Sequence, residues 1–232
     1  MVKDTSRRCH TQGRRERALS WIPCRQGLLL DVGCGPTKGG SPYCAKSDDV
    51  ILLDMNRAFL AGNGEVDGTH PLIGDGAALP LSDGCVDTVV ATEVLEHVPS
   101  DVKMISEVSR VLKPGGRFII TVPNAGLCGF LDPNHFGPAR VVLKIIGKES
   151  QPLHRHYSLD DLRALLKDDF IIEYLSRTGC WVTGICVLLV QFSKLVGSRR
   201  LESLFNTIGA HDYQLEYGAG AYNLAVSARK AE

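Results

Sequence analysis

The sequence predicts an α/β fold built on one doubly wound, mostly parallel sheet of seven strands, with helices on both faces and an apolar helical insertion near the carboxyl terminus. Short apolar runs alternate with helical patterns and turn signals from residue 28 onward. The runs are rich in Val, Ile and Leu without strict alternation, which is typical of parallel strands buried on both faces. Hydrophobic residues make up 44% and charged residues 22% of the 232 residues, a composition that predicts a folded domain with a full core.

The expected strands fall into two groups along the chain. Five come first and two follow a long interval, at 28–32, 50–54, 71–74, 86–91, 117–122, 170–175 and 222–228. Between the fourth and fifth strands, apolar residues recur at spacings of three and four over 102–112, before Pro114-Gly115-Gly116, and predict one crossover helix. A further helix is expected to begin at Ser158, which has capping-box spacing to Asp161.

Composition divides the chain into a basic arm with a short helix over 1–27 and a single domain over 28–232. Within that domain, 123–157 holds Gly, Pro and Asn with one apolar patch and is expected to form a lid over an acceptor region. The apolar insertion spans 179–210, and its uninterrupted apolar run is shorter than the ~20 residues that a membrane span needs. We therefore expect no transmembrane helix there.

Two interpretations of the segment 181–208 remain open. Apolar residues at 201, 204, 205 and 208 predict a one-sided apolar helix directly after the basic pair Arg199-Arg200. Such a segment either packs on the sheet or a partner subunit, or docks peripherally on a membrane or a lipid substrate.

Charge and cysteine usage limit the partners and the compartment. Lys plus Arg total 26 and Asp plus Glu total 26, so no global field attracts nucleic acid, and no nucleic-acid partner is expected. The eight cysteines form no C-x-x-C pair, which favours reduced thiols and no metal site. The basic arm contains no apolar signal-peptide core. We expect a cytoplasmic protein, with peripheral membrane contact left open.

Acidic residues follow three successive predicted strands. The first strand runs into Asp31-Val32-Gly33-Cys34-Gly35, the second ends at Asp54, and the third is followed by Asp75-Gly76-Ala77. Glycines permit a sharp turn and a close approach of backbone to ligand, and an acid at the second strand end suits two ribose hydroxyls. Each aspartate alone is also compatible with a turn or cap. Together they indicate a nucleoside cofactor, and Lys38 at the third glycine position of G-x-G-x-x-G argues against a dinucleotide.

Several motifs in this order resemble the class I S-adenosylmethionine-dependent methyltransferases, in the ubiquinone and menaquinone biosynthesis group (methyltransferase type 11). They lie within 28–124 and comprise the glycine segment 31–35, Leu53-Asp54, 74–81, 86–90, Glu93-Val94-Leu95-Glu96-His97-Val98 and 112–116. The resemblance implies a Rossmann-like fold and S-adenosylmethionine as the cofactor.

The resemblance also implies roles for individual residues. Gly33 and Gly35, with Cys34 between them, would lie against the methionine part, and Asp31 would contact its ammonium group. Asp54 would hold the ribose, Met55 would cover the adenine face, and Asp75, Gly76 and Ala77 would recognise the adenine edge. Glu93 and Val94 would close the cofactor pocket. Residues 36–42 depart from the family pattern, because they hold prolines and glycines in place of an apolar helix, which we expect to be short or irregular.

Methyl transfer from a sulfonium needs alignment of the acceptor rather than a nucleophilic side chain. His97 is the candidate general base for a hydroxyl acceptor, because one helical turn after Glu93 would let both face the crevice. His135, His154, His156 and Tyr157 are candidates for the acceptor pocket. We expect a small or lipid-linked acceptor methylated at oxygen or carbon. The alternative is a non-catalytic scaffold protein that binds S-adenosylmethionine.

Overall fold

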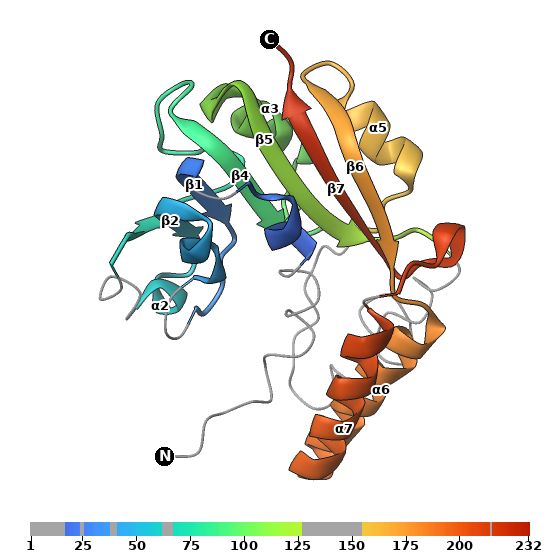
Figure 1. The fold of residues 1–232 in the computed structure, drawn as a ribbon. Helices are drawn as coiled ribbons and strands as arrows, with labels where there is room; N and C mark the ends of the chain where they lie inside the picture. Colours follow the sequence, from blue (N-terminus) through green and yellow to red (C-terminus); the bar gives the residue numbers. More distant parts are fainter. Residues whose placement is uncertain (1–16, 24–25, 38–40, 62–66, 127–154, 214) are drawn as a thin grey trace.

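The computed structural model describes residues 17–23, 26–37, 41–61, 67–126, 155–213 and 215–232. The basic arm before residue 17 and most of the expected lid lie outside the described residues, and so do His135 and His154. The described segments form a sheet with helices on both faces and a helical hairpin at one end (Figure 1).

The sheet has seven strands in the order β3-β2-β1-β4-β5-β7-β6. Their bounds are β1 Gln26–Val32, β2 Ser47–Asp54, β3 Thr69–Ile73, β4 Val86–Thr92, β5 Leu112–Pro123, β6 Phe170–Thr178 and β7 Asn223–Lys230. The first five pair in parallel, and β7 pairs antiparallel with both β5 and β6. The seven-stranded, mostly parallel sheet is therefore confirmed. The carboxyl ends of β1 to β6 share one edge.

One face of the sheet is covered by α3 (Asp101–Val111) and α5 (Leu159–Leu166). Their apolar sides bury Met104, Val108 and Leu162 against Phe118 and Val226 of the strands. The capping box predicted at Ser158 is present, since its side chain accepts from the Asp161 amide and Asp161 accepts from the Ser158 amide. The crossover helix ends at Val111, before Pro114, because Leu112 already pairs with Val86.

The opposite face is covered by shorter elements. Residues 17–21 are helical, η1 (Pro42–Ala45) is a single 3-10 turn, and α2 (Arg57–Leu60) has one turn. Ile22 and Tyr43 pack there with Leu29, Leu52 and Ile119 of the sheet. In the described part of the stretch between the glycine turn and β2, the expected helix is thus reduced to η1, capped by Ser41. This confirms the prediction of a short helix.

A pair of antiparallel helices joins β6 to β7. Helix α6 (Trp181–Leu195) packs against α7 (Arg199–Asp212), which is followed by the short turn η3 (Gly218–Gly220). Figure 1 shows this pair extending away from the carboxyl edge of the sheet. We call it the α6–α7 hairpin. Among the described helices, none combines the length and the apolarity needed to cross a membrane.

Candidate functional site

The glycine turn after β1 is held against the end of β2. The amides of Gly33 and Cys34 donate to the Leu53 carbonyl oxygen over 2.8 and 3.1 Å. The amide of Gly35 donates to Oδ2 of Asp54 over 3.0 Å, while Oδ1 of Asp54 accepts from the Asn56 amide over 2.8 Å. The carboxylate at the second strand end therefore fixes the path of the turn.

Two glycines of this turn adopt left-handed backbone angles for different reasons. Gly33 has φ +66°, and a Cβ there would lie 2.5 Å from a methyl carbon of Val94. Gly35 has φ +61°, but a Cβ there would meet no described atom within 4 Å. Gly33 is thus required for packing against the segment after β4, whereas Gly35 presents bare backbone to open space.

The loop after β3 joins the same edge. The Gly74 amide donates to the Asp54 carbonyl oxygen over 3.3 Å, and Oδ1 of Asp75 accepts from the Ala77 amide over 2.9 Å. A Cβ at Gly76 would lie 3.1 Å from a Val32 methyl carbon, so this glycine allows the loop to approach the end of β1. The ends of β1, β2 and β3 therefore meet, as the three acidic motifs predict.

Other predicted cofactor residues differ in their exposure. Asp31 is 1% exposed within β1, where its Cα neighbours are Leu52 of β2 and Val90 of β4. Cys34 is buried in the core beneath the glycine turn. Met55 is 72% exposed and is open to contact by a ligand.

Glu93 follows β4 and has φ +57°, a strained value for a residue with a side chain. Its amide donates to the Thr121 carbonyl oxygen over 3.0 Å. Its Oε1 accepts from the Thr121 hydroxyl over 2.9 Å and from the Asn223 side-chain amide over 2.8 Å. Sequence reasoning missed Thr121 and Asn223, because their proximity to Glu93 arises only when β5 and β7 pair.

The prediction that Glu93 and His97 share one turn of a helix is wrong. Residues 95–97 form a turn, and α3 begins only at Asp101. The left-handed φ of Glu93 prevents a right-handed helix from passing through it. His97 instead lies beside Glu96, with Nε2 3.8 Å from Oε1 of that buried carboxylate. His97 remains a candidate base, but not as a helical partner of Glu93.

Tyr157 belongs to the core rather than to an open surface. Its side chain is 4% exposed, and its hydroxyl lies 3.1 Å from the Leu95 carbonyl oxygen and 3.2 Å from Oδ2 of Asp101. Burial and the nearby Asp101 carboxylate raise the pKa of Tyr157 to about 12, against the opposing effect of Arg155. The hydroxyl is therefore protonated and can donate to the Leu95 carbonyl oxygen or to Asp101. His156 beside it is partly buried.

No group of three or more His, Cys, Asp or Glu side chains in the described part of the chain is placed to hold a metal ion.

Comparison with known proteins identifies relatives over most of the chain. A family model described as "Methyltransferase domain" matches residues 30–120. An uncharacterized methyltransferase of Mycobacterium ulcerans is 35% identical over 184 residues, covering 69% of this chain and 70% of that protein. A demethylmenaquinone methyltransferase of Renibacterium salmoninarum is 28% identical over 162 residues, 65% of each chain.

A probable S-adenosylmethionine-dependent methyltransferase of Mycolicibacterium smegmatis is 37% identical over 105 residues, 44% of this chain and 40% of that protein. This chain therefore covers less than two thirds of the length of that relative.

Solved structures show the same fold at low identity. A putative S-adenosylmethionine-dependent methyltransferase of Listeria monocytogenes has a TM-score of 0.63 at 15% identity, covering 97% of this chain and 99% of that one. An S-adenosylmethionine-dependent methyltransferase of Mesorhizobium loti has a TM-score of 0.60 at 19% identity, covering 94% and 99%. The Mycobacterium ulcerans relative, the family model and the order of the motifs show that the chain belongs to the class I S-adenosylmethionine-dependent methyltransferases, in the group similar to the ubiquinone and menaquinone enzymes.

Proposed function

We propose that this chain binds S-adenosylmethionine at the carboxyl edge of β1 to β4 and catalyses transfer of its methyl group to a small or lipid-linked acceptor, at oxygen or carbon. The observation that carries the proposal is the glycine turn, in which Asp54 holds the Gly35 amide and no described atom covers Gly35. Open backbone beside a carboxylate is the arrangement expected where an adenosyl ligand lies against a strand end.

The residues at this edge suit the parts of that ligand. A carboxylate offers about four acceptor positions, and Asp54 uses two of them on backbone amides, which leaves capacity for ribose hydroxyls. Exposed Met55 offers an apolar surface to the adenine, and the Asp75-Gly76-Ala77 loop offers its backbone to the ring edge. Buried Asp31 supplies negative charge at the end of β1, which favours a cationic ligand.

When bound, S-adenosylmethionine supplies a methyl group already activated by a positive sulfur. The chain contributes alignment of the acceptor and exclusion of water. Glu93 and Val94 close the pocket, since Val94 packs on Gly33 and Glu93 is fixed by Thr121 and Asn223. For a hydroxyl acceptor, His97 accepts the proton that the acceptor loses.

Calorimetry with S-adenosylmethionine tests the binding step. We expect Asp54→Ala to weaken binding at least tenfold, about 1.4 kcal/mol. The matched control is Asp49→Ala, because Asp49 lies at the other end of β2 and contacts His70. Equal binding by the wild type and Asp54→Ala would remove Asp54 from the site.

Turnover distinguishes the enzyme from a non-catalytic scaffold. Labelled donor is incubated with the protein and with lipid and aqueous fractions of a cell extract. Transfer of label into either fraction supports the enzyme and identifies the acceptor class. Tight donor binding without transfer in any fraction favours the scaffold alternative.

His97→Asn tests the proton-transfer step once an acceptor is found. If a hydroxyl is methylated, kcat should fall by roughly 10²- to 10⁴-fold with little change in donor binding. An unchanged rate would show that the acceptor loses its proton without His97.

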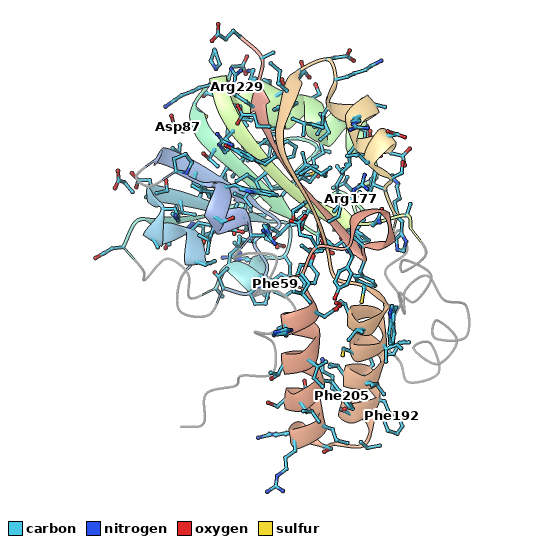
Figure 2. The ribbon with its side chains drawn as sticks, turned by 45° about the vertical axis from the view of Figure 1, so that its right-hand side comes forward. Phe59, Asp87, Arg177, Phe192, Phe205 and Arg229 are labelled. Carbon is cyan, nitrogen blue, oxygen red and sulfur yellow. The ribbon has the colours of Figure 1, made fainter. Side chains whose placement is uncertain are left out.

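We also propose that the α6–α7 hairpin makes peripheral contact with a membrane or a lipid-carried acceptor. Large apolar side chains remain exposed along it, including Phe192 at 56% and Leu195 at 62%, and Figure 2 shows Phe192 on the hairpin away from the sheet. In liposome flotation, Phe192→Ser with Leu195→Ser should reduce the floating fraction. Ile171→Ser is the control, since Ile171 is 52% exposed on β6. Equal recovery of all three proteins at the bottom of the gradient would contradict membrane contact.

A further inference from the structure

The guanidinium of Arg177 lacks an acceptor among the described residues. Arg177 is the penultimate residue of β6, is partly buried, and is labelled near α5 in Figure 2. Its Nε is buried and has no hydrogen-bond partner, and no ion pair to the guanidinium occurs in the described part of the chain.

This is unusual for an arginine. The side chain is always charged and carries five N–H donors, and a buried donor without an acceptor is destabilising. Two other partly buried arginines are paired: Arg110 contacts Asp83 at 2.6 Å and Glu107 at 2.8 Å, and Arg155 contacts Asp101 at 3.0 Å. The buried Nε of Arg177 therefore lacks an acceptor, and its two terminal guanidinium nitrogens, which are not buried, are the donors that a ligand can reach.

The same arginine lines a cavity of about 340 Å³ at the carboxyl edge of β5 and β6. Asn124 follows β5, Leu224 lies opposite Arg177 in the β6–β7 pairing, and Ser158 and Arg163 come from α5. A cavity of this size accommodates a small molecule or part of one.

A second cation, Arg163, lines this cavity, and so does the carboxylate of Asp160. Arg163 contacts Asp160 at 3.2 Å, but their side chains are 61% and 89% exposed, so this is a weak surface pair. Arg163 can turn from Asp160 to a ligand at little cost.

We propose that this cavity, the Arg177 pocket, binds the carboxylate or phosphate group of a small molecule, with the Arg177 guanidinium as its main ligand and Arg163 as a second cation. A planar fork of N–H donors matches both groups bidentately. The pocket also adjoins the methyl-transfer edge, because Pro123, which precedes Asn124, pairs with Asn223, the residue that donates to Glu93. The group therefore belongs either to the methyl acceptor or to a separate anion.

Titration of the whole chain with inorganic phosphate and with acetate tests the site, by calorimetry and by the melting temperature. Saturable binding of at least one anion is expected in the wild type, weakened tenfold or more in Arg177→Met and less in Arg177→Lys. Arg200→Met is the control, because Arg200 is exposed on α7 and its loss changes the net charge equally. Absence of saturable binding in the wild type, or equal binding in Arg177→Met, would overturn the proposal.

The melting temperature in anion-poor buffer gives a second test, because Arg177→Met is expected to weaken anion binding but to raise stability when no anion is present. Because Arg177→Met removes an unpaired buried donor, its melting temperature in anion-poor buffer should exceed that of the wild type, and added phosphate should no longer raise it. A lower melting temperature in both conditions would show that Arg177 serves packing alone.

Competition between phosphate and the methyl acceptor shows whether the bound anionic group belongs to the acceptor. This experiment needs the labelled-donor assay, whereas anion titration and the melting temperature can be measured without turnover. Phosphate that raises the KM for the acceptor without changing kcat indicates an acidic acceptor. Binding of phosphate without an effect on KM indicates a separate anion. A catalytically inactive protein that still binds phosphate through Arg177 would contradict the proposed function and leave the pocket in place.

Discussion

The glycine turn and the base of the α6–α7 hairpin both place an aspartate at the carboxyl edge of the sheet, but the two carboxylates are used differently. Asp54 accepts from two backbone amides and lies beside bare glycine backbone. Asp212 is 5% exposed and is surrounded by donors from three other residues. The amides of Cys180 and Thr183, the Thr183 hydroxyl, the Cys180 thiol and the Tyr217 hydroxyl all donate to it.

The difference separates a structural site from a binding site. The saturated Asp212 carboxylate has no acceptor position left for a ligand, and it joins the start of α6 to the end of α7. Asp54 retains acceptor positions, and the terminal guanidinium nitrogens of Arg177 have no acceptor among the described residues. Polar groups at this edge that folding leaves unsatisfied are therefore the ones to test for binding.

The largest effect on stability is expected from Asp212→Ala. Five donors would lose a buried charged acceptor at once, so the free energy of unfolding should fall by about 3–5 kcal/mol. Urea denaturation measures this change. Asp168 is exposed, so the control Asp168→Ala should change the free energy of unfolding by no more than about 0.5 kcal/mol. A comparably small loss in both variants would show that the hairpin is held by its apolar contacts alone.

Gly33→Ala should be next in size, at about 2–4 kcal/mol, from the left-handed φ and the overlap with Val94. Adding Val94→Ala to the Gly33→Ala variant should restore the part of the lost stability that is due to overlap with the Val94 side chain. Denaturation of the two single variants and the double variant separates the two contributions. Additive losses in the double variant would contradict contact between these residues.

The acid dependence of stability should contain a contribution from Asp212. Burial opposes its ionisation, but hydrogen bonds from Thr183, Tyr217 and Cys180 outweigh that effect and lower the pKa of Asp212. A carboxylate whose pKa is lower in the folded state than in the unfolded state stabilises the fold once it is ionised. The stabilisation is therefore complete above the unfolded pKa of about 3.9 and is lost as pH falls through the lower folded pKa.

The difference in the free energy of unfolding between the wild type and Asp212→Asn should therefore become smaller as the pH falls from 6 to 3. Urea denaturation at a series of pH values measures it. A constant difference over that range would contradict the lowered pKa.

The smallest effect on stability is expected at Gly35, where ligand binding can be measured separately from the cost of backbone strain. Gly35→Ala and Gly115→Ala both place a side chain at a left-handed φ with no described atom within 4 Å, so each should cost about 1 kcal/mol. Only Gly35→Ala should also weaken S-adenosylmethionine binding in calorimetry, because only Gly35 lies in the glycine turn. Equal affinity of the two variants for S-adenosylmethionine would show that the ligand does not bind against the glycine turn.

Local features of the fold were predictable because their signals lie within a few residues. Buried apolar runs located six of the seven strands to within three residues at each end, whereas β5 begins at Leu112, five residues before the predicted start. Ser158 with Asp161 located the start of α5. The turn after β1 was predictable from its two glycines. The helical path assumed from Glu93 to His97 failed, since the φ of Glu93 is imposed by its contacts with β5 and β7.

The sequence by itself determined the order of strands, helices and acidic turns, because hydrophobic periodicity, capping and glycine backbone freedom act over short separations. Tertiary structure alone decided which polar groups meet. Asn223 contacts Glu93 across 130 residues, and Asp212 contacts Cys180 across 32. Tertiary structure also left Arg177 without a partner, because β7 enters the sheet between β5 and β6 and brings Leu224, an apolar residue, opposite it. Pairing between distant segments depends on sheet register, which no local pattern specifies.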